Sequence, residues 1–424
     1  MANRWKIPAA AVGFALLSCL CSPSFADNTV WNLDEVVRIS LERHPLVSQA
    51  DAEIRAAGAR KGQAESAYYP AIGLSTGYSR SRSFSSLSQR NLTTSSGFVQ
   101  GNLSQIITDF GRTGAAVDRA GALLSSTKET GRSVRAEVGF AAKVAYFNIL
   151  RAQRIVAVEK ETLKQRETLL RQAQAYYQAG IRARIDVARA EANLFQARAE
   201  LTSAENDLRV ARITLLNRMG IDGPRDFGIK DTLAAESLPG TLDEWVKEAE
   251  DRRPELRALI EKERAAYLNL RTASAGYNPI LTGGAGYGYA AEDPPLEQNY
   301  NVSVLLSVPV FSGFLTRQQV AEARAQLSSA NFAVTDFRRQ VFLEVEQAAL
   351  SVRAAAERTD ARRKEKEASG ENLRLATARY EVGAGDIIEM IDAQVQMARA
   401  DTDMIDALYD YSVSVAALER AMGR

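Results

Sequence analysis

Four segments of the chain alternate apolar and polar side chains with a period of two. In segment 300–310 one face is mostly small and polar, and the other carries Tyr300, Val302, Val304, Leu306 and Val308. Segments 281–291 and 72–78 alternate in the same way, and segment 99–103 does so more weakly. This period is typical of a β-strand with different environments on its two faces. The pattern predicts strands of about ten residues, paired in hairpins over about 71–107 and 280–310.

Two further segments, about 113–178 and 316–381, contain no proline and scarcely any glycine, and their apolar residues recur at heptad-like spacing. They predict helices that pack along their length. About 65 residues at roughly 1.5 Å each span on the order of 100 Å, which is more than a globular domain needs. Gly180 and Gly383 predict tight turns, after which returning helices complete helical hairpins over about 113–218 and 316–421.

The second half of the chain repeats the first. Leu33-Asp34-Glu35 recurs 209 residues later as Leu242-Asp243-Glu244, and Met219-Gly220 recurs 203 residues later as Met422-Gly423. The shift changes across the polar, Ser-rich interval 79–97, which we interpret as an insertion at a hairpin tip. Sustained register of this kind indicates a duplicated unit. The chain is therefore divided into a first repeat over 27–220, a linker over 221–241 and a second repeat over 242–424.

The N-terminal residues 1–26 have the order of a secretory signal peptide. Arg4 and Lys6 precede an apolar stretch, and Ser24-Phe25-Ala26 ends it as a small-x-small cleavage site. An alternative is a lipobox that makes Cys19 a lipidated N-terminus. Cleavage after Ala26 leaves a chain without cysteine, whose net charge falls from +1 to −1 because two cations leave. Packing and oligomerisation, rather than disulfides, must then hold the exported protein together.

Composition narrows the possible functions. The 424 residues carry a net charge of +1, so there is no basic excess with which to bind nucleic acid. One histidine and two cysteines argue against a zinc or thiol enzyme, and no pocket or nucleophile accompanies the acidic residues, so we expect no enzyme and no cofactor. Outside the first 25 residues no apolar run approaches 18 residues, so we expect no membrane-spanning helix.

The predicted strands fit two environments. One is a small soluble sheet packed on the helices, and the other is a membrane β-barrel with an apolar exterior and a wet interior. The signal peptide, and the lack of a helix to cover an apolar sheet face, favour the barrel. Four strands cannot close around a pore, because even small membrane barrels need about eight. The chain must therefore oligomerise, and each copy lends four strands.

The whole pattern resembles one known family, the TolC-like outer membrane factors. The resemblance covers nearly all of residues 31–424 and includes two strand-to-helix junctions, at 107–112 and 308–313, and two helix-tip turns, at 177–183 and 380–383. It implies a homotrimer in the outer membrane of a Gram-negative cell. The implied fold is mainly α with membrane β: long helical hairpins form a twelve-helix periplasmic tunnel joined to a twelve-stranded barrel in the outer-membrane lipid.

The resemblance also implies a function and a gate. The function is the exit duct of a tripartite efflux pump or a type I secretion system, docked to a periplasmic adaptor protein and an inner-membrane pump of the RND or ABC type. The family's periplasmic gate residues correspond to Asp186, Glu389, Asp392 and Tyr380. The arginine expected two residues after the second-turn glycine is Gly385 here. The adaptor-docking tips correspond to Gly180, Ile181, Arg182, Ala183, Gly383, Ala384 and Gly385.

Charges near the two turns suggest how the tips close. Glu389 and Asp392 are three residues apart and share one helix face, so three copies present a ring of six carboxylates that favours cations. Near the first turn the charges are positive: Arg182, Arg184 and Arg189. We hypothesise that these arginines pair with Asp386, Glu389 and Asp392 of neighbouring hairpins in the shut state. The alternative for the tips is an ordinary solvated helix end, and the alternative for the whole protein is a periplasmic coiled-coil tether without a channel.

Overall fold

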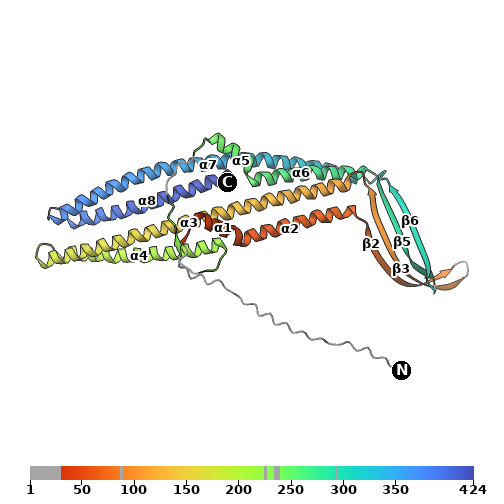
Figure 1. Cartoon of the computed structure of the whole chain (residues 1–424), viewed down its shortest axis with the longest axis horizontal. Helices are drawn as coiled ribbons and strands as arrows, with labels where there is room; N and C mark the ends of the chain where they lie inside the picture. Colours follow the sequence, from red (N-terminus) through yellow and green to blue (C-terminus); the bar gives the residue numbers. More distant parts are fainter. Residues whose placement is uncertain (1–29, 86–88, 224–226, 234–238, 293–294) are drawn as a thin grey trace, which may run out of the picture.

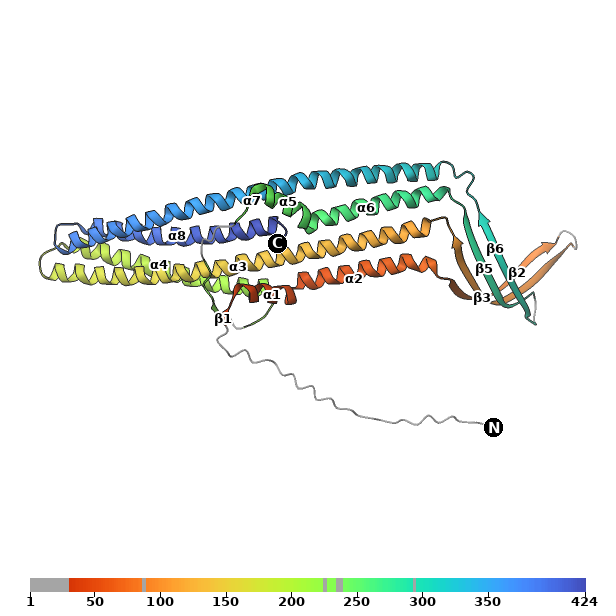
Figure 2. The ribbon, with the colours of Figure 1, turned by 45° about the horizontal axis from the view of Figure 1, so that its top comes forward.

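The computed structural model describes residues 30–85, 89–223, 227–233, 239–292 and 295–424. The predicted signal peptide, with Cys19, lies outside the described residues. The molecule is long and thin: the helices run side by side along most of its length, and a sheet extends from one end (Figures 1 and 2). Within the described part of the chain, no helix has an apolar stretch that suffices to cross a bilayer.

The two halves of the chain contain the same elements in the same order. The first half runs α1 Leu33–Arg43, α2 Pro45–Glu65, β2 Ala71–Ser85, β3 Arg90–Thr108, α3 Arg112–Gln178 and α4 Arg184–Met219. The second half runs α5 Leu242–Arg252, α6 Pro254–Ser274, β5 Ile280–Glu292, β6 Glu297–Ser307, α7 Leu315–Glu381 and α8 Ile387–Ala421. Helices α3 and α7 each have 67 residues, so each is about 100 Å long.

The starts of the short helices follow from local chemistry. Asn32 before α1 accepts a hydrogen bond from the backbone N–H of Glu35, and the Glu35 carboxylate accepts one from the backbone N–H of Asn32. Thr241 and Glu244 form the same capping box before α5. Each box satisfies two backbone N–H groups that the helix leaves without partners. Prolines at the first position of α2 and α6 need no such partner, so each helix pair has a fixed break between its members.

Equivalent residues of the two halves form two equivalent cores. Leu215 and Met219 of α4 are fully buried against α1 and α3, and Leu418 and Met422 are fully buried against α5 and α7. The halves also interlock, since α3 packs along α6 and α8. The Ser126 hydroxyl on α3 donates to the Ala258 carbonyl on α6 at 2.9 Å. The duplication therefore produces one continuous bundle rather than two separate domains.

The linker between the halves is tied to the bundle at mid-length. Strand β4, Gly228–Ile229, pairs in parallel with β1, Val30–Trp31. Buried Tyr146 on α3 donates its hydroxyl hydrogen to the Lys230 carbonyl at 2.5 Å, and Arg154 pairs with Asp231 at 2.8 Å. These contacts hold residues 227–233 against the middle of α3.

The four long strands form one antiparallel sheet in the order β2-β3-β5-β6. The expectation that residues 79–97 form a loop tip is wrong, because β2 continues to Ser85 and β3 begins at Arg90, with Ser79 paired to Ser96. Their hydroxyls lie 2.8 Å apart, so cross-strand contacts between small polar side chains extend the ladder. The strands of this hairpin have 15 and 19 residues, and those of the β5–β6 hairpin have 13 and 11.

One face of the sheet is apolar and exposed in the single chain. Leu74 on β2 and Val302 on β6 are each 80% exposed, and the helices extend away from the sheet rather than over it (Figure 1). The outer strands β2 and β6 each have an unpaired edge. An exposed apolar face of this kind is typical of a surface that contacts a membrane or another protein. The two open edges can pair with strands of further copies of the chain.

The strand-to-helix junctions use left-handed backbone conformations. Phe110 and Gly111 have φ of 53° and 98° before α3, and Gly313 and Phe314 have φ of 62° and 66° before α7. In the first junction the Asp109 carboxylate accepts hydrogen bonds from the backbone N–H and the hydroxyl of Thr113 at 2.7 and 2.5 Å. Each junction turns the chain sharply from the sheet into a long helix.

Candidate functional site at the hairpin tips

The two helical turns lie at the end of the molecule opposite the sheet (Figures 1 and 2). Gly180 and Gly383 have φ of +71° and +77°, the left-handed conformation that glycine adopts without strain. The N–H of Ile181 donates to the Tyr176 carbonyl, and the N–H of Ala384 donates to the Arg379 carbonyl, each at 2.9 Å. This is one capping motif used twice, as the duplication requires.

Tyr380, near the end of α7, lies at the centre of the tip. It is 1% exposed, and its ring centroid is 6.0 Å from that of Tyr176 on α3. The surrounding cluster is apolar and consists of Leu169, Ala173, Ala190, Ile387, Met390 and Ile391. The Tyr380 hydroxyl oxygen is buried without a hydrogen-bond partner among the described residues. Burial raises the pKa of this tyrosine, and the nearby Arg182 cation partly opposes that change.

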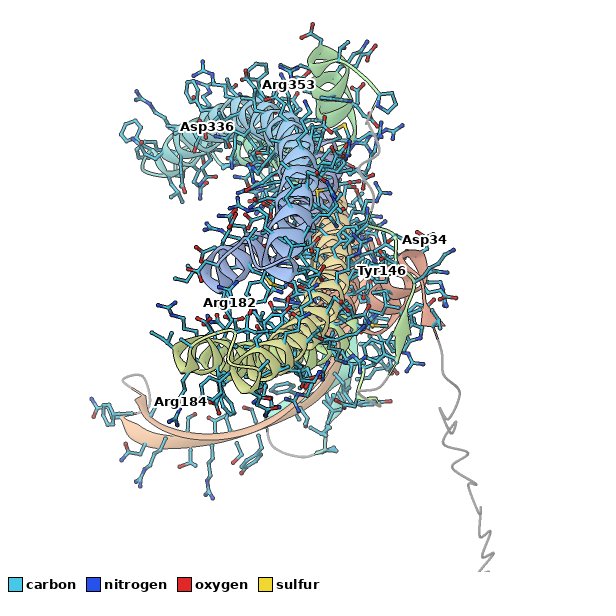
Figure 3. All side chains as sticks on the ribbon, turned by 90° about the vertical axis from the view of Figure 1, so that its left-hand side faces the viewer. Asp34, Tyr146, Arg182, Arg184, Asp336 and Arg353 are labelled. Carbon is cyan, nitrogen blue, oxygen red and sulfur yellow. The ribbon has the colours of Figure 1, made fainter. Side chains whose placement is uncertain are left out.

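Arg182 connects the first turn to the second. Its guanidinium carbon lies 5.5 Å from the centroid of the Tyr380 ring, within the range of a cation–π contact. Its Nη2 atom donates a hydrogen bond to the Gly385 carbonyl at 2.8 Å. The view onto the tips shows Arg182 between the two hairpins, whereas Arg184 lies on the outer side of the first hairpin (Figure 3).

A side chain at Gly385 would be packed more tightly than usual. A Cβ atom there would lie 3.1 Å from both the carbonyl carbon and the Cβ of Arg379. The arginine that the family resemblance implies at this position is absent, and in this chain the guanidinium group of Arg182, from the other hairpin, lies over the Tyr380 ring.

The four predicted carboxylates occupy different surroundings. Asp186 is 7% exposed in the first turn of α4, close enough to Tyr380 to contribute to the rise in the pKa of that tyrosine. Glu389 and Asp392 are exposed on one face of α8, away from the buried cluster. The Glu389 carboxylate pairs with Arg379 of its own hairpin at 3.1 Å. Asp386, exposed, is the residue before α8 and makes no side-chain capping bond.

The three arginines that were predicted to pair with these carboxylates also differ in their contacts. Within the described residues of one chain, Arg182 contacts a ring and a carbonyl rather than a carboxylate, and Arg184 and Arg189 form no ion pair. The hypothesised pairing of these arginines with Asp386, Glu389 and Asp392 of neighbouring hairpins stays a prediction.

One polar link was not anticipated from the sequence. Arg166 on α3 is 4% exposed, and its Nη1 atom donates to the Gln394 amide oxygen on α8 at 2.5 Å. Loss of hydration lowers the pKa of this arginine. The residue carries no sequence signal, because an arginine within a long helix is ordinarily exposed.

In the described part of the chain, no three His, Cys, Asp or Glu side chains come together as a metal site would require. The molecule thus has two helical hairpins with closely packed turns at one end and a sheet with an exposed apolar face at the other.

Comparison with known proteins identifies the class. A family model described as outer membrane efflux protein matches residues 36–220 and 245–424. The chain is similar to the outer membrane protein OprJ of Pseudomonas aeruginosa, 28% identical over 327 residues that cover 74% of this chain and 67% of the relative. It is also similar to the outer membrane protein TolC of Vibrio cholerae, 25% identical over 413 residues that cover 93% and 92%. A crystal structure of a membrane protein from Pseudomonas aeruginosa matches with a TM-score of 0.83 and 25% identity, over 92% of this chain and 93% of that one.

The chain belongs to the outer membrane efflux protein family. This membership confirms the expected fold class, the outer-membrane location and the function of an exit duct, and it sets aside the periplasmic tether. Proteins of this family are channels rather than enzymes.

Proposed function

We propose that three copies of the chain form one closed channel. Strand β6 of each copy pairs with β2 of the next, which gives a barrel of twelve strands and removes both open edges. The exposed apolar face then meets lipid, and the polar face, with residues such as Asn301 and Ser303, lines the pore. The four long helices of each copy continue the barrel as a twelve-helix tunnel through the periplasm.

The hairpin tips form the gate of this tunnel and the docking site for a periplasmic adaptor, which links the duct to an inner-membrane pump of the RND or ABC type. Ile181 and Val382 are 66% and 78% exposed at the turns, so apolar side chains are presented to a partner. Arg182 holds the two turns of one copy together, and Glu389 and Asp392 face the pore. Docking at the turns then competes with the contacts that Arg182 makes.

The contact of Arg182 with Tyr380 and Gly385 is the observation that carries the gate proposal. A cation–π contact and a hydrogen bond from a charged donor together contribute about 1–3 kcal/mol when partly buried. Since about 1.4 kcal/mol is a factor of ten, the two contacts together favour the closed tip by about 5- to 150-fold in each copy.

The test is the variant Arg182→Ala in the full-length trimer, recorded in planar bilayers. We expect the fraction of time in a high-conductance state to rise at least severalfold. Arg209→Ala, which removes an exposed arginine of α4 far from the turns, is the matched control and should leave the recordings unchanged. If Arg182→Ala trimers gate like the wild type, the proposal that the contacts of Arg182 hold the tip closed is wrong, whereas the proposal that the trimer is a channel still stands.

A further inference from the structure

Two arginines continue the apolar face of strand β2. Alternate residues of a strand point to the same face, so Ile72, Leu74, Tyr78, Arg80 and Arg82 form one row. The lower part of this row is apolar and exposed, and both arginines are also exposed. The charged end of the row is the end farthest from the helices, near the tip of the β2–β3 hairpin (Figure 1).

Aromatic side chains mark both limits of the apolar face. Toward the helices these are Phe110, Phe311 and Phe314, which are 57%, 74% and 60% exposed. Toward the hairpin tips Tyr287 and Tyr300 lie level with Leu74 in the strand register, and Tyr289 and then Tyr78 lie successively farther out on the same face. Girdles of this kind lie at the two interfaces between a bilayer and water. Arg80 follows Tyr78 by two residues, about 7 Å along the strand, so both arginines lie just beyond the outer girdle, at the level of lipid headgroups.

Among the described residues, the two arginines have no partner of opposite charge, and this arrangement favours an anion. Arg80 is opposite Ser95 and Arg82 is opposite Thr93, so hydroxyl groups of β3 share their face. Among the described residues, neither guanidinium forms an ion pair, and no carboxylate side chain lies beside them in this register. The charge is therefore uncompensated within the part of the chain that the structure describes.

The duplication provides an internal comparison. With the 209-residue shift, Arg80 and Arg82 correspond to Tyr289 and Ala291 of the second copy. The same strand position thus tolerates uncharged residues. The two cations are a property of the longer first hairpin, not a requirement of the strand.

We propose that Arg80 and Arg82, with Ser95 and Thr93, bind the phosphate headgroup of a phosphorylated glycolipid in the outer leaflet, at one site per copy on the outside of the barrel. A guanidinium group presents a planar fork of donors that matches phosphate oxygens, and hydroxyls supply further donors. We propose that the phosphate belongs to a lipid rather than to a free anion. The reason is that the apolar row next to the arginines is then in contact with the acyl chains of the same lipid. The inference rests on the assembled barrel proposed above.

Native mass spectrometry of the detergent-solubilised full-length trimer tests this proposal, with diphosphoryl lipid A and its dephosphorylated form as probes. We expect the wild type to retain up to three diphosphoryl lipids per trimer and the dephosphorylated lipid at least tenfold less. The variant Arg80→Tyr/Arg82→Ala, which copies the side chains of the second repeat, should lose this preference. The variant Arg55→Gln/Arg60→Gln, which removes two exposed arginines from α2, is the matched control and should keep it.

The outcomes separate the two proposals. Conducting trimers that retain both lipids equally, or that keep the preference for diphosphoryl lipid without Arg80 and Arg82, overturn the headgroup site and leave the channel standing. A wild-type chain that forms no trimer overturns the channel and the site together. Charge-preserving Arg80→Lys/Arg82→Lys should retain part of the preference, because a lysine is a point charge without the guanidinium fork.

Discussion

At the scale of single residues, the tip depends on the ring of Tyr380 rather than on its hydroxyl. The ring contacts Arg182 and Tyr176, whereas the hydroxyl is buried without a partner among the described residues. A buried hydroxyl without a hydrogen bond costs about 1–3 kcal/mol. The tyrosine was predicted from the sequence by resemblance, but the contact with Arg182 was not, because the two turns are about 200 residues apart and only the packed bundle brings them together.

Tyr380→Phe should therefore leave the gate closed. We expect the single-channel recordings to match the wild type within about twofold, and the melting temperature to stay equal or rise slightly, since an unsatisfied polar group is removed. Tyr380→Ala should open the tip, because it removes the ring and leaves a cavity. An open channel in Tyr380→Phe would mean that the hydroxyl holds the closed state through a neighbouring copy.

The close packing around Gly385 leads to a second prediction at the scale of single residues. Gly385→Ala places a methyl group against the backbone of Arg379, which cannot move away as a flexible side chain would. The backbone must give by a few tenths of an ångström. We expect this adjustment to weaken the hydrogen bond from Arg182, so the open fraction in planar bilayers rises, by less than in Arg182→Ala. Ala384→Ser, at the exposed neighbouring position, is the control and should behave as the wild type.

At the scale of elements, the pattern along the chain predicted the helices better than the strand ends. Long helices leave a strong signal, because proline and glycine are excluded over many turns. The outer part of the β2–β3 hairpin left none, since serine-rich strands such as 79–85 look like loops until their partners are known. In the same way, only the packing of α3 on α8 explains why Arg166 is buried.

The link between Arg166 and Gln394 can be tested as a unit. Gln394→Leu leaves a buried cation without its partner and should destabilise the bundle by about 2–4 kcal/mol. The double variant Arg166→Met/Gln394→Leu replaces both groups with apolar ones and should recover most of the loss. Thermal unfolding of the trimer, read as a double-mutant cycle, measures the coupling. Additive losses in the double variant would show that the two side chains act independently.

At the scale of the whole molecule, threefold assembly multiplies every side chain that faces the pore. Glu389 and Asp392 are exposed on one face of α8. In the proposed assembly this face points into the tunnel, so three copies bring six carboxylates to its narrow end. A ring of acids raises the local concentration of cations and repels anions. The selectivity of the channel should then come from the tips rather than from the barrel, whose polar face carries mainly neutral amides and hydroxyls.

Neutralising both acids tests this assembly. Glu389→Gln/Asp392→Asn should lower the ratio of potassium to chloride permeability severalfold, measured from reversal potentials in a salt gradient. Glu42→Gln, an exposed acid on α1 far from the turns, should leave the ratio unchanged. Unchanged selectivity in the double variant would place the two acids outside the conduction path.

The left-handed junctions at Phe110–Gly111 and Gly313–Phe314 have a mechanical consequence. Because α3 and α7 are unbroken for about 100 Å, each acts as a stiff lever whose pivot lies at the membrane. A tilt of about 1° at the pivot moves the far end by about 2 Å, which is several times the range of about 0.5 Å over which a hydrogen bond holds its length. Small strains imposed on the sheet by bilayer thickness are thus magnified at the opposite end, so lipid composition becomes one of the variables that set how easily the duct opens.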